Sequence, residues 1–198
     1  MKKNIIAICG ASASGKDTIA NLVYTYLLTN PKNNCGLIVG DTTRPCRTDE
    51  IDGINYNFVK PVEFIEKIAQ HKFIDYQNFR GWLYGIPLNS IKYDINIGVF
   101  NARTMDRLLQ MTDKYNIVLI YLTASYWTRL KRSCIREGKF KFEFIRRSFS
   151  DFSDYIRLVR HFHKKYNIAM HKFKTDTDIP NLSSIIARRI INILKYSK

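Results

Sequence analysis

Short apolar runs alternate with amphipathic segments along most of the chain. Some of the runs are rich in β-branched residues, which is typical of buried strands: 4–9, 37–39, 95–100 and 117–122. Other segments carry apolar residues at helical spacing: 18–28, 61–70, 104–111, 126–134, 144–162 and 182–194. Strands that alternate with helices predict the α/β class, with a parallel sheet flanked by helices.

The segment 41–92 interrupts this alternation. It is rich in aromatic residues and contains the turn pairs Asp52-Gly53 and Arg80-Gly81. We therefore expect a small subdomain at 41–92, inserted into a core made of 1–40 and 93–198. Because the chain has 198 residues and is 45% hydrophobic, one core with inserted flaps is favoured over two independent domains.

Charge and cysteine content restrict the class of partner and the compartment. Lys and Arg total 32 against 17 Asp and Glu, so the net charge of +15 predicts anionic partners: nucleotides, nucleic acid or an acidic surface. The cysteines Cys9, Cys35, Cys46 and Cys134 lack the paired spacing of a zinc site or a disulfide framework. No apolar run has the length of a membrane span, and the apolar stretch behind the N-terminal lysines is too short for a signal peptide. We expect a reduced, cytoplasmic setting.

A glycine-rich turn follows the first predicted strand. Its sequence, GASASGKDT at 10–18, places Gly10, Gly15 and Lys16 at the spacing of a phosphate-binding loop between a strand and a helix. The glycines let backbone N–H groups face an anion, the helix N-terminus adds positive potential, and the lysine reaches the outer phosphates. The candidate nucleotide-binding residues are Gly10, Ala11, Ser12, Ala13, Ser14, Gly15, Lys16, Asp17 and Thr18.

Asp17 stands where such a loop normally has serine or threonine, whose hydroxyl binds magnesium directly. One interpretation keeps Asp17 at the metal through water, because magnesium retains several of its waters. The other makes Asp17 a helix cap and leaves the metal to Thr18 or another carboxylate. The nucleotide site is expected in both cases, and its metal ligands stay open.

A second anion site is indicated downstream. Arg44 and Arg47 lie close together in DTTRPCRTDEIDGINYNF, and with Tyr56 and Tyr84 they would clamp one phosphate group, because guanidinium groups match phosphate oxygens in pairs. The segment resembles the guanylate kinase family, whose pattern runs close to S-T-T-R-x-x-R-x-x-E-x-x-G-x-x-Y-x-F, then E-F-x-x-x-I and G-x-x-Y-G. The matching residues are Thr42, Thr43, Arg44, Arg47, Glu50, Gly53, Tyr56, Phe58, Glu63, Phe64, Ile68, Phe73, Gly81, Tyr84 and Gly85.

This resemblance implies the fold of a phosphate-loop nucleoside monophosphate kinase, with 41–92 as the monophosphate-binding subdomain and 131–150 as a lid. It implies transfer of the γ-phosphate of ATP, with Mg²⁺, to (d)GMP or a related monophosphate. The implied acceptor-binding residues are Arg44, Arg47, Tyr56, Asp75 and Tyr84. The implied catalytic residues are Lys16, Arg44 and the lid arginines Arg132, Arg136 and Arg147.

Several positions depart from the guanine-binding pattern of the family. Gly40 replaces a serine, Asp75 is shorter than the usual glutamate, and Ile86 replaces a hydroxyl-bearing residue. Asn101 and Arg103 occupy the place of an acidic strand end. We expect the phosphate clamp to be retained and Asp75 to contact the base, whereas the identity of the base does not follow.

Asp41 also departs from the family, because it replaces the first serine of the S-T-T-R segment. A carboxylate near bound phosphate is unfavourable unless a cation lies between them, so one expectation turns Asp41 toward the magnesium. The alternative is a turn in which the Asp41 side chain bonds its own backbone.

Three other functions stay open from the sequence. One is a kinase for a different phosphorylated small molecule, such as a sugar phosphate, if Gly40, Ile86 and Asn101 have changed the pocket. Another is a non-catalytic guanylate kinase-like module that binds phosphorylated partners, although such modules usually lose the lysine present here as Lys16. The third is nucleic-acid binding driven by the net charge, which predicts steeply salt-dependent affinity.

Overall fold

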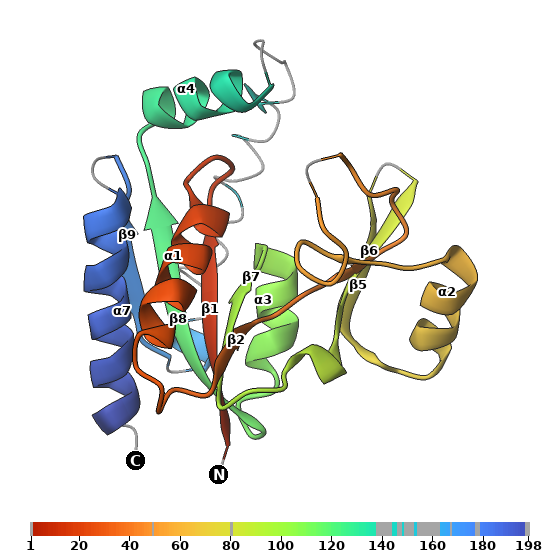
Figure 1. Cartoon of the computed structure of the whole chain (residues 1–198), viewed down its shortest axis with the longest axis horizontal. Coiled ribbons are helices and arrows are strands. Elements are labelled where there is room, and N and C mark those ends of the chain that lie inside the picture. Colours follow the sequence, from red (N-terminus) through yellow and green to blue (C-terminus); the bar gives the residue numbers. More distant parts are fainter. Residues whose placement is uncertain are drawn as a thin grey trace.

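A five-stranded parallel sheet forms the centre of the protein (Figure 1). The structure, a computed structural model, describes residues 2–48, 50–79, 81–137, 144, 145, 148, 153, 163–166, 168–176 and 179–196. The strand order is β2-β7-β1-β8-β9. The strands are β1 (Lys3–Gly10), β2 (Cys35–Leu37), β7 (Ile95–Val99), β8 (Tyr115–Thr123) and β9 (Met170–Lys174). The predicted α/β class with a parallel sheet is confirmed.

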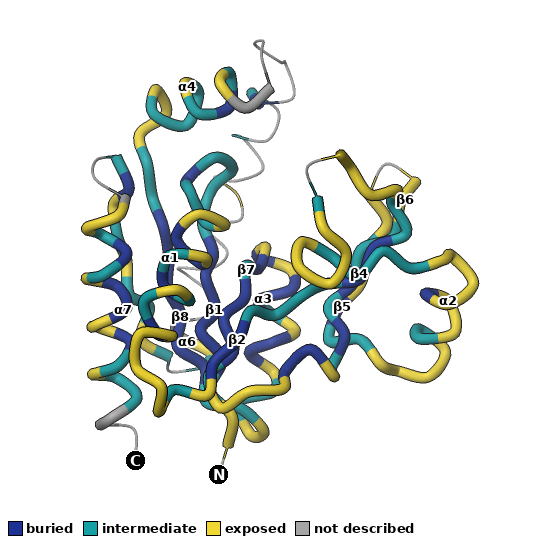
Figure 2. Tube along the Cα trace, viewed as in Figure 1, coloured by how far each residue is buried: buried dark blue, intermediate teal, exposed yellow. Residues whose placement is uncertain are grey.

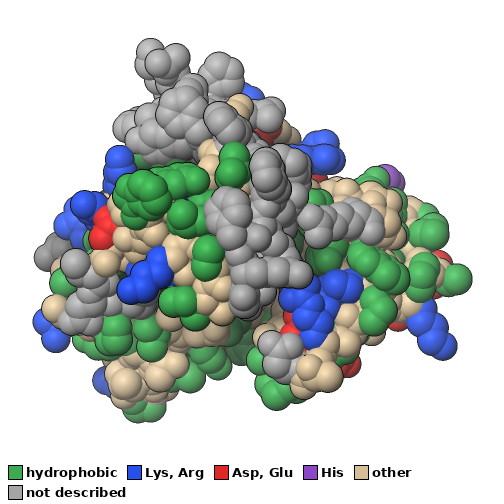
Figure 3. Space-filling view, turned by 90° about the horizontal axis from the view of Figure 1, so that it is seen from above, with side chains coloured by type: hydrophobic (Ala, Val, Ile, Leu, Met, Phe, Trp, Pro, Cys, Tyr) green, Lys and Arg blue, Asp and Glu red, His purple; other side chains and the backbone are tan. Residues whose placement is uncertain are grey.

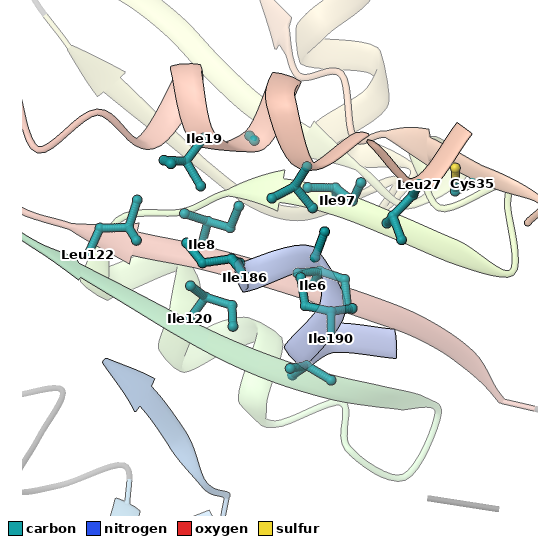
Figure 4. Packing of buried hydrophobic residues seen from close by; sticks show 14 residues of the cluster. Ile6, Ile8, Ile19, Leu27, Cys35, Ile97, Ile120, Leu122, Ile186 and Ile190 are labelled. Atoms are coloured by element: carbon teal, nitrogen blue, oxygen red, sulfur yellow. The ribbon is translucent and has the colours of Figure 1, made fainter. Parts of the chain in front are cut away.

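Helices cover both faces of this sheet. The helices α1 (Lys16–Leu28) and α7 (Ile179–Tyr196) pack on one face, and α3 (Ala102–Leu109) packs on the other. Successive side chains of a strand point to opposite faces, so Ile6 and Ile8 of β1 join the α1 and α7 core while Ile5 joins the α3 core. Figure 4 shows the first of these cores. The helices α4 (Tyr126–Glu137) and α6 (His163–Tyr166) lie between β8 and β9 in the chain.

The chain between β2 and β7 forms a second sheet of four strands in the order β4-β3-β6-β5. Its elements are β3 (Asp41–Thr42), β4 (Asn57–Phe58), α2 (Pro61–Ala69), β5 (Phe73–Phe79), β6 (Trp82–Pro87) and a 3-10 turn (Leu88–Ser90). All of them fall within 41–92, the segment expected as an insertion, and the division into core and subdomain stays a prediction.

Phe64 anchors α2 to this second sheet. It is fully buried and stacks on Phe73 of β5, with 4.5 Å between the ring centroids. Gly85 of β6 makes room for both rings, because a Cβ there would lie 2.7 Å from Phe73 and 2.9 Å from Phe64. The rest of α2 is mostly exposed (Figure 2). Phe64 is therefore the buried side chain through which α2 packs on this sheet.

Two strands differ from the sequence expectations. The strand β2 covers Cys35–Leu37 rather than 37–39. The sequence does not predict β9, because MHKFK at Met170–Lys174 lies at the sheet edge and is only half-buried, so no apolar run marks it. Most of the helix expected at 144–162 lies outside the described residues. Within the part of the chain that the structure describes, no helix is long and apolar enough to cross a membrane.

Replacing Phe64 with alanine should destabilise the protein far more than the same change at Val62, an exposed neighbour on α2. Phe64→Ala leaves a cavity against Phe73 and should cost about 3–5 kcal/mol. Val62→Ala should change the free energy of unfolding by less than about 0.5 kcal/mol. Urea unfolding of both variants measures this difference, and equal losses would contradict the packing described.

Candidate active site

The phosphate-binding loop begins where β1 ends. Gly10 is the last residue of the strand and has φ 149°, and a Cβ on it would lie 2.2 Å from the main-chain oxygen of Leu122 on β8. Gly15 has φ 84° and caps α1, which begins at Lys16. No side chain fits at Gly10, and Gly15 adopts a conformation that favours glycine. Backbone geometry therefore requires both of the glycines that the sequence pattern singled out.

Contacts inside the loop hold its main chain. The N–H of Ser14 donates to the carbonyl oxygen of Ala11 at 3.1 Å, and the ammonium group of Lys16 donates to the same oxygen at 2.8 Å. Ser14 itself is fully buried. A curled loop directly before a helix N-terminus can offer several N–H groups and a positive potential to one anion.

A cleft of about 600 Å³ lies between α1 and the second sheet. On the α1 side it is lined by Asp17, Ala20 and Asn21, which share one face of the helix because they are three and four positions apart. The wall from the second sheet includes every residue that the sequence placed at the acceptor: Arg44, Arg47, Tyr56, Asp75 and Tyr84. The strands β2 and β7 add apolar residues between the two walls: Leu37, Ile97 and Val99.

Glu50 organises the arginine loop, the segment between β3 and β4 that carries Arg44 and Arg47. Its carboxylate accepts two hydrogen bonds from the Arg44 guanidinium, both at 2.8 Å, and one from the backbone N–H of Arg47 at 3.0 Å. The hydrogen bonds from Arg44 lower the pKa of Glu50 and raise the pKa of Arg44, so both groups stay charged. The guanidinium also lies 5.7 Å from the Tyr56 ring centroid and 5.5 Å from that of Phe58. Arg44 is thus held in place at the cleft wall.

The sequence match included Glu50 but gave it no role. The available signal was its position three residues after Arg47, where the turn in the chain returns its carboxylate to the arginines.

The two tyrosines of the clamp pack edge to face, with 6.0 Å between the ring centroids of Tyr56 and Tyr84. Burial raises the pKa of Tyr56, and the negative charge of Asp17 raises it further. The Tyr56 hydroxyl therefore stays protonated at neutral pH and is able to donate a hydrogen bond to a phosphate. Asp17 and Tyr56 line the same cleft, so α1 and the segment that carries Tyr56 face each other across it.

Asp75 is buried in the wall of the cleft. Its Oδ2 accepts a hydrogen bond from the Thr104 hydroxyl at 2.8 Å, and its Oδ1 lies 3.8 Å from Nε of Arg103. Asn101 caps α3, because its Oδ1 accepts from the N–H of Thr104 at 2.8 Å. The first turn of α3 thus fixes Asp75. The sequence did not reveal this role of Thr104, which depends on a contact between distant segments.

Asp41 does not face the cleft, as the magnesium expectation required. It is 1% exposed, and its two oxygens accept hydrogen bonds from Nδ2 of Asn57 at 2.7 Å and Nζ of Lys67 at 2.8 Å. A buried carboxylate is costly without a compensating charge, and Lys67 supplies that charge. Asp41 therefore joins β3 to β4 and α2, a structural role that differs from the expected metal ligand. These partners are side chains, so they also differ from the alternative expectation, a turn in which Asp41 bonds its own backbone.

Arg132 makes a contact different from the one expected of a lid arginine. Its guanidinium donates to the hydroxyl of Thr175 at 3.3 Å and also to the main-chain oxygen of Thr175. The expected partner was the phosphoryl group in transfer, and Arg132 does not line the cleft. The side chain of Arg136 and the whole of Arg147 lie outside the described residues.

Arg129, which the sequence analysis did not select, reaches the phosphate-binding loop. Its Nη1 donates to the carbonyl oxygen of Ser12 at 3.4 Å, and its guanidinium lies 5.7 Å from the ring centroid of Phe144. The three-residue spacing of Arg129 and Arg132 was the available signal, because it places both on one face of α4. This face of α4 is turned toward the loop.

Asp17 is a carboxylate that could hold Mg²⁺ without further protein ligands. Among the described residues, no cluster of three or more His, Cys, Asp and Glu side chains could hold a metal ion. Mg²⁺ does not need one, because it keeps several waters and binds through one or two carboxylates together with substrate phosphates. Asp17 meets that requirement, since it is exposed in the first turn of α1 and lines the cleft.

Known proteins are similar to this chain in sequence. The family model described as guanylate kinase matches residues 2–186. The chain is 29% identical over 186 residues to the guanylate kinase of Clostridium tetani, which covers 92% of this chain and 85% of that protein. It is 30% identical over 161 residues to the guanylate kinase of Streptococcus mutans, covering 80% of this chain and 75% of that protein.

A solved structure shares the fold. The guanylate kinase from Anaplasma phagocytophilum superimposes with a TM-score of 0.59 and 20% identity, over 99% of this chain and 86% of that one. Residues of α1, the helix that follows the phosphate-binding loop, line one cleft together with Arg44 and Arg47. The chain belongs to the guanylate kinase family of ATP-dependent nucleoside monophosphate kinases.

Proposed function

We propose that this chain transfers the γ-phosphate of ATP to GMP or dGMP and so forms the diphosphate. The observation that carries the proposal is the shared cleft, with Asp17 of the phosphate-loop helix on one wall and the Arg44 and Arg47 clamp on the other. A phosphoryl group can pass directly between two nucleotides only if their phosphates meet in one space. The cleft volume of about 600 Å³ falls within the range of small-molecule sites.

Binding of ATP is assigned to the loop at 10–18. Its N–H groups and Lys16 would hold the β- and γ-phosphates at the N-terminus of α1. Mg²⁺, when bound, would neutralise part of the phosphate charge, and Asp17 is the residue placed to hold it through water.

Binding of the acceptor phosphate is assigned to Arg44, Arg47, Tyr56 and Tyr84. The two guanidinium groups supply charge and paired donors, and the tyrosines supply hydroxyl donors. Glu50 fixes Arg44 before the acceptor arrives, so that less conformational freedom is lost on binding. The acceptor is a phosphate monoester that is already ionised at neutral pH. The reaction then needs positioning and charge neutralisation rather than a strong base.

Recognition of guanine is assigned to Asp75. A carboxylate accepts hydrogen bonds, and guanine presents two adjacent donors, N1–H and the 2-amino group, on one edge. Adenine presents only its 6-amino group on the corresponding edge. Asp75 lines the cleft and is held by Thr104, so its lone pairs have a fixed direction.

The lid assignment is divided between two groups of arginines. Arg136 and Arg147 remain the proposed contacts to the phosphoryl group in transfer, because the contact of Arg132 with Thr175 directs it elsewhere. Closure of the lid would exclude water and so prevent hydrolysis of ATP.

The wider setting of the proposal follows from charge and cysteine state. The net charge of +15 suits two polyanionic substrates, and Figure 3 shows Lys and Arg side chains in several separate groups on one face. The cysteines Cys9, Cys35, Cys46 and Cys134 are free thiols, as a reduced cytoplasmic setting would keep them.

A sugar phosphate is a second possible class of acceptor, because of two residues that line the cleft. Gly40 and Ile86 both line the cleft, and neither offers a side-chain hydrogen bond to a base. A Cβ on Gly40 would lie 3.0 Å from the carbonyl oxygen of Gly85, so this position is tight as well as non-polar. A sugar phosphate in place of a nucleotide is the alternative that these residues favour.

A screen of ADP release across ribo- and deoxynucleoside monophosphates and sugar phosphates should identify GMP or dGMP as the best acceptor. Lys16→Ala should lower turnover by about 100-fold or more, because the lysine neutralises phosphate charge. Lys32→Ala, at an exposed lysine after α1, is the matched control and should keep full activity. Turnover with a sugar phosphate alone would favour the second acceptor class, and no turnover above the ATP-only background would contradict kinase activity altogether.

Asp75→Asn should lower kcat/KM for GMP by about 10–100-fold, because an amide nitrogen would then face the donors of guanine. The KM for ATP should stay within about twofold, since Asp75 belongs to the acceptor wall. Asp94→Asn, an exposed carboxylate before β7, serves as the control with unchanged kinetics. If GMP turned over equally well with Asp75→Asn, the base would be read by other groups.

A further inference from the structure

Thr175 lies where three segments of the proposed ATP site meet. It directly follows β9, and its N–H donates to the carbonyl oxygen of Thr123 at 2.7 Å, which extends the pairing of β9 with β8. Its side chain is completely buried. A buried hydroxyl in such a position normally has hydrogen-bond partners. Here the partners come from the phosphate loop and from α4, the lid helix, whose last turns belong to the expected lid at 131–150.

The Thr175 hydroxyl contacts both segments at once. Its Oγ1 donates to the carbonyl oxygen of Ser14 at 2.8 Å, a shorter distance than the 3.2 Å to the oxygen of Thr123. The same Oγ1 accepts from Nη1 of Arg132 at 3.3 Å, and Arg132 also donates to the Thr175 carbonyl oxygen. A hydroxyl has one proton and two lone pairs, so it can serve Ser14 and Arg132 together.

The contact with Ser14 fixes the direction of a main-chain N–H group. A trans peptide is planar, and its C=O and N–H point in opposite directions. When the Ser14 carbonyl is anchored on Thr175, the N–H of Gly15 in the same peptide points away from Thr175. That N–H belongs to the loop whose N–H groups are proposed to bind phosphate.

Regular secondary structure does not impose this orientation. Ala13 has φ 59° and Gly15 has φ 84°, so the loop backbone on both sides of Ser14 is left-handed rather than helical or extended. The loop precedes α1 and follows β1, and its peptides take their direction from individual contacts. The bond from Thr175 is such a contact and links positions 161 residues apart.

We propose that Thr175 is a positioning residue for ATP: it orients the Ser14–Gly15 peptide for phosphate binding and couples that peptide to the lid helix through Arg132. The inference rests on the proposed function, because it takes the loop as the ATP site. It also gives Arg132 a role that differs from direct contact with the transferring phosphoryl group.

The test is direct binding of a fluorescent ATP analogue to Thr175→Val and Thr175→Ser. Valine keeps the shape and removes the hydroxyl, so binding should weaken about tenfold, equivalent to about 1.4 kcal/mol. Serine keeps the hydroxyl and should stay within about threefold of the parent protein. The KM for GMP should change by less than about twofold in both, since Thr175 does not line the acceptor cleft.

Thr123→Val is the matched control, because the Thr123 hydroxyl bonds the carbonyl oxygen of Phe173 within the same strand pair and not the loop. It should bind the analogue within about twofold of the parent. A general loss of folding would reduce the active fraction in all variants without changing the affinity of the remainder. A specific weakening in Thr175→Val, with rescue by serine, therefore supports positioning.

Arg132→Ala adds a second line of evidence. It should weaken binding of the analogue at least threefold. The double variant with Thr175→Val should bind no more than about twofold weaker than Thr175→Val alone, because both substitutions act through one hydroxyl. If Thr175→Val did not fold, Arg132→Ala would decide, and unchanged binding would overturn the inference. Equal binding by folded Thr175→Val and the parent would also overturn it, with the proposed function intact. Absence of binding by the parent would instead contradict the ATP site itself.

Discussion

The parallel pairing of β1 with β7 and β8 is the constraint on which the site depends. In a parallel sheet every strand ends at the same edge, so the loops that follow the strands are brought together there. Gly10 at the end of β1 lies in register with Leu122 of β8, and the two main chains approach so closely that no Cβ fits between them. The phosphate loop follows β1 and the second sheet follows β2. The helix α3, whose Thr104 bonds Asp75, follows β7, and Thr175 follows β9. One packing arrangement therefore brings together segments from almost the whole chain.

The charged groups of the site are held by protein partners. Arg44 is fixed by Glu50 and Asp75 by Thr104. Each pair limits the motion of a charged side chain before any substrate binds, which reduces the reorganisation needed during the reaction. A site of this kind suits phosphoryl transfer, in which the protein supplies position and counter-charge more than covalent chemistry.

The sequence predicted those parts of the fold and site that depend on neighbouring residues. The spacing of Gly10, Gly15 and Lys16 indicates the loop because a strand, a tight turn and a helix follow one another in the chain. The ion pair of Asp41 and the bond from Thr175 to Ser14 join distant segments, and no local pattern reports them. The edge strand β9 was not predicted for a related reason: its polar sequence forms a strand through its pairing with β8. The family resemblance selected the residues proposed to bind the acceptor, while the contacts that hold them required the structure.

The proposed reaction requires two nucleotides to place their phosphates in one cleft. A bisubstrate compound, with adenosine and guanosine joined by five phosphates, tests it most directly in a calorimetric titration with competition by each substrate. We expect one bound compound per chain, displaced by both ATP and GMP. A compound that competed with only one of the two nucleotides, or bound twice per chain, would contradict it.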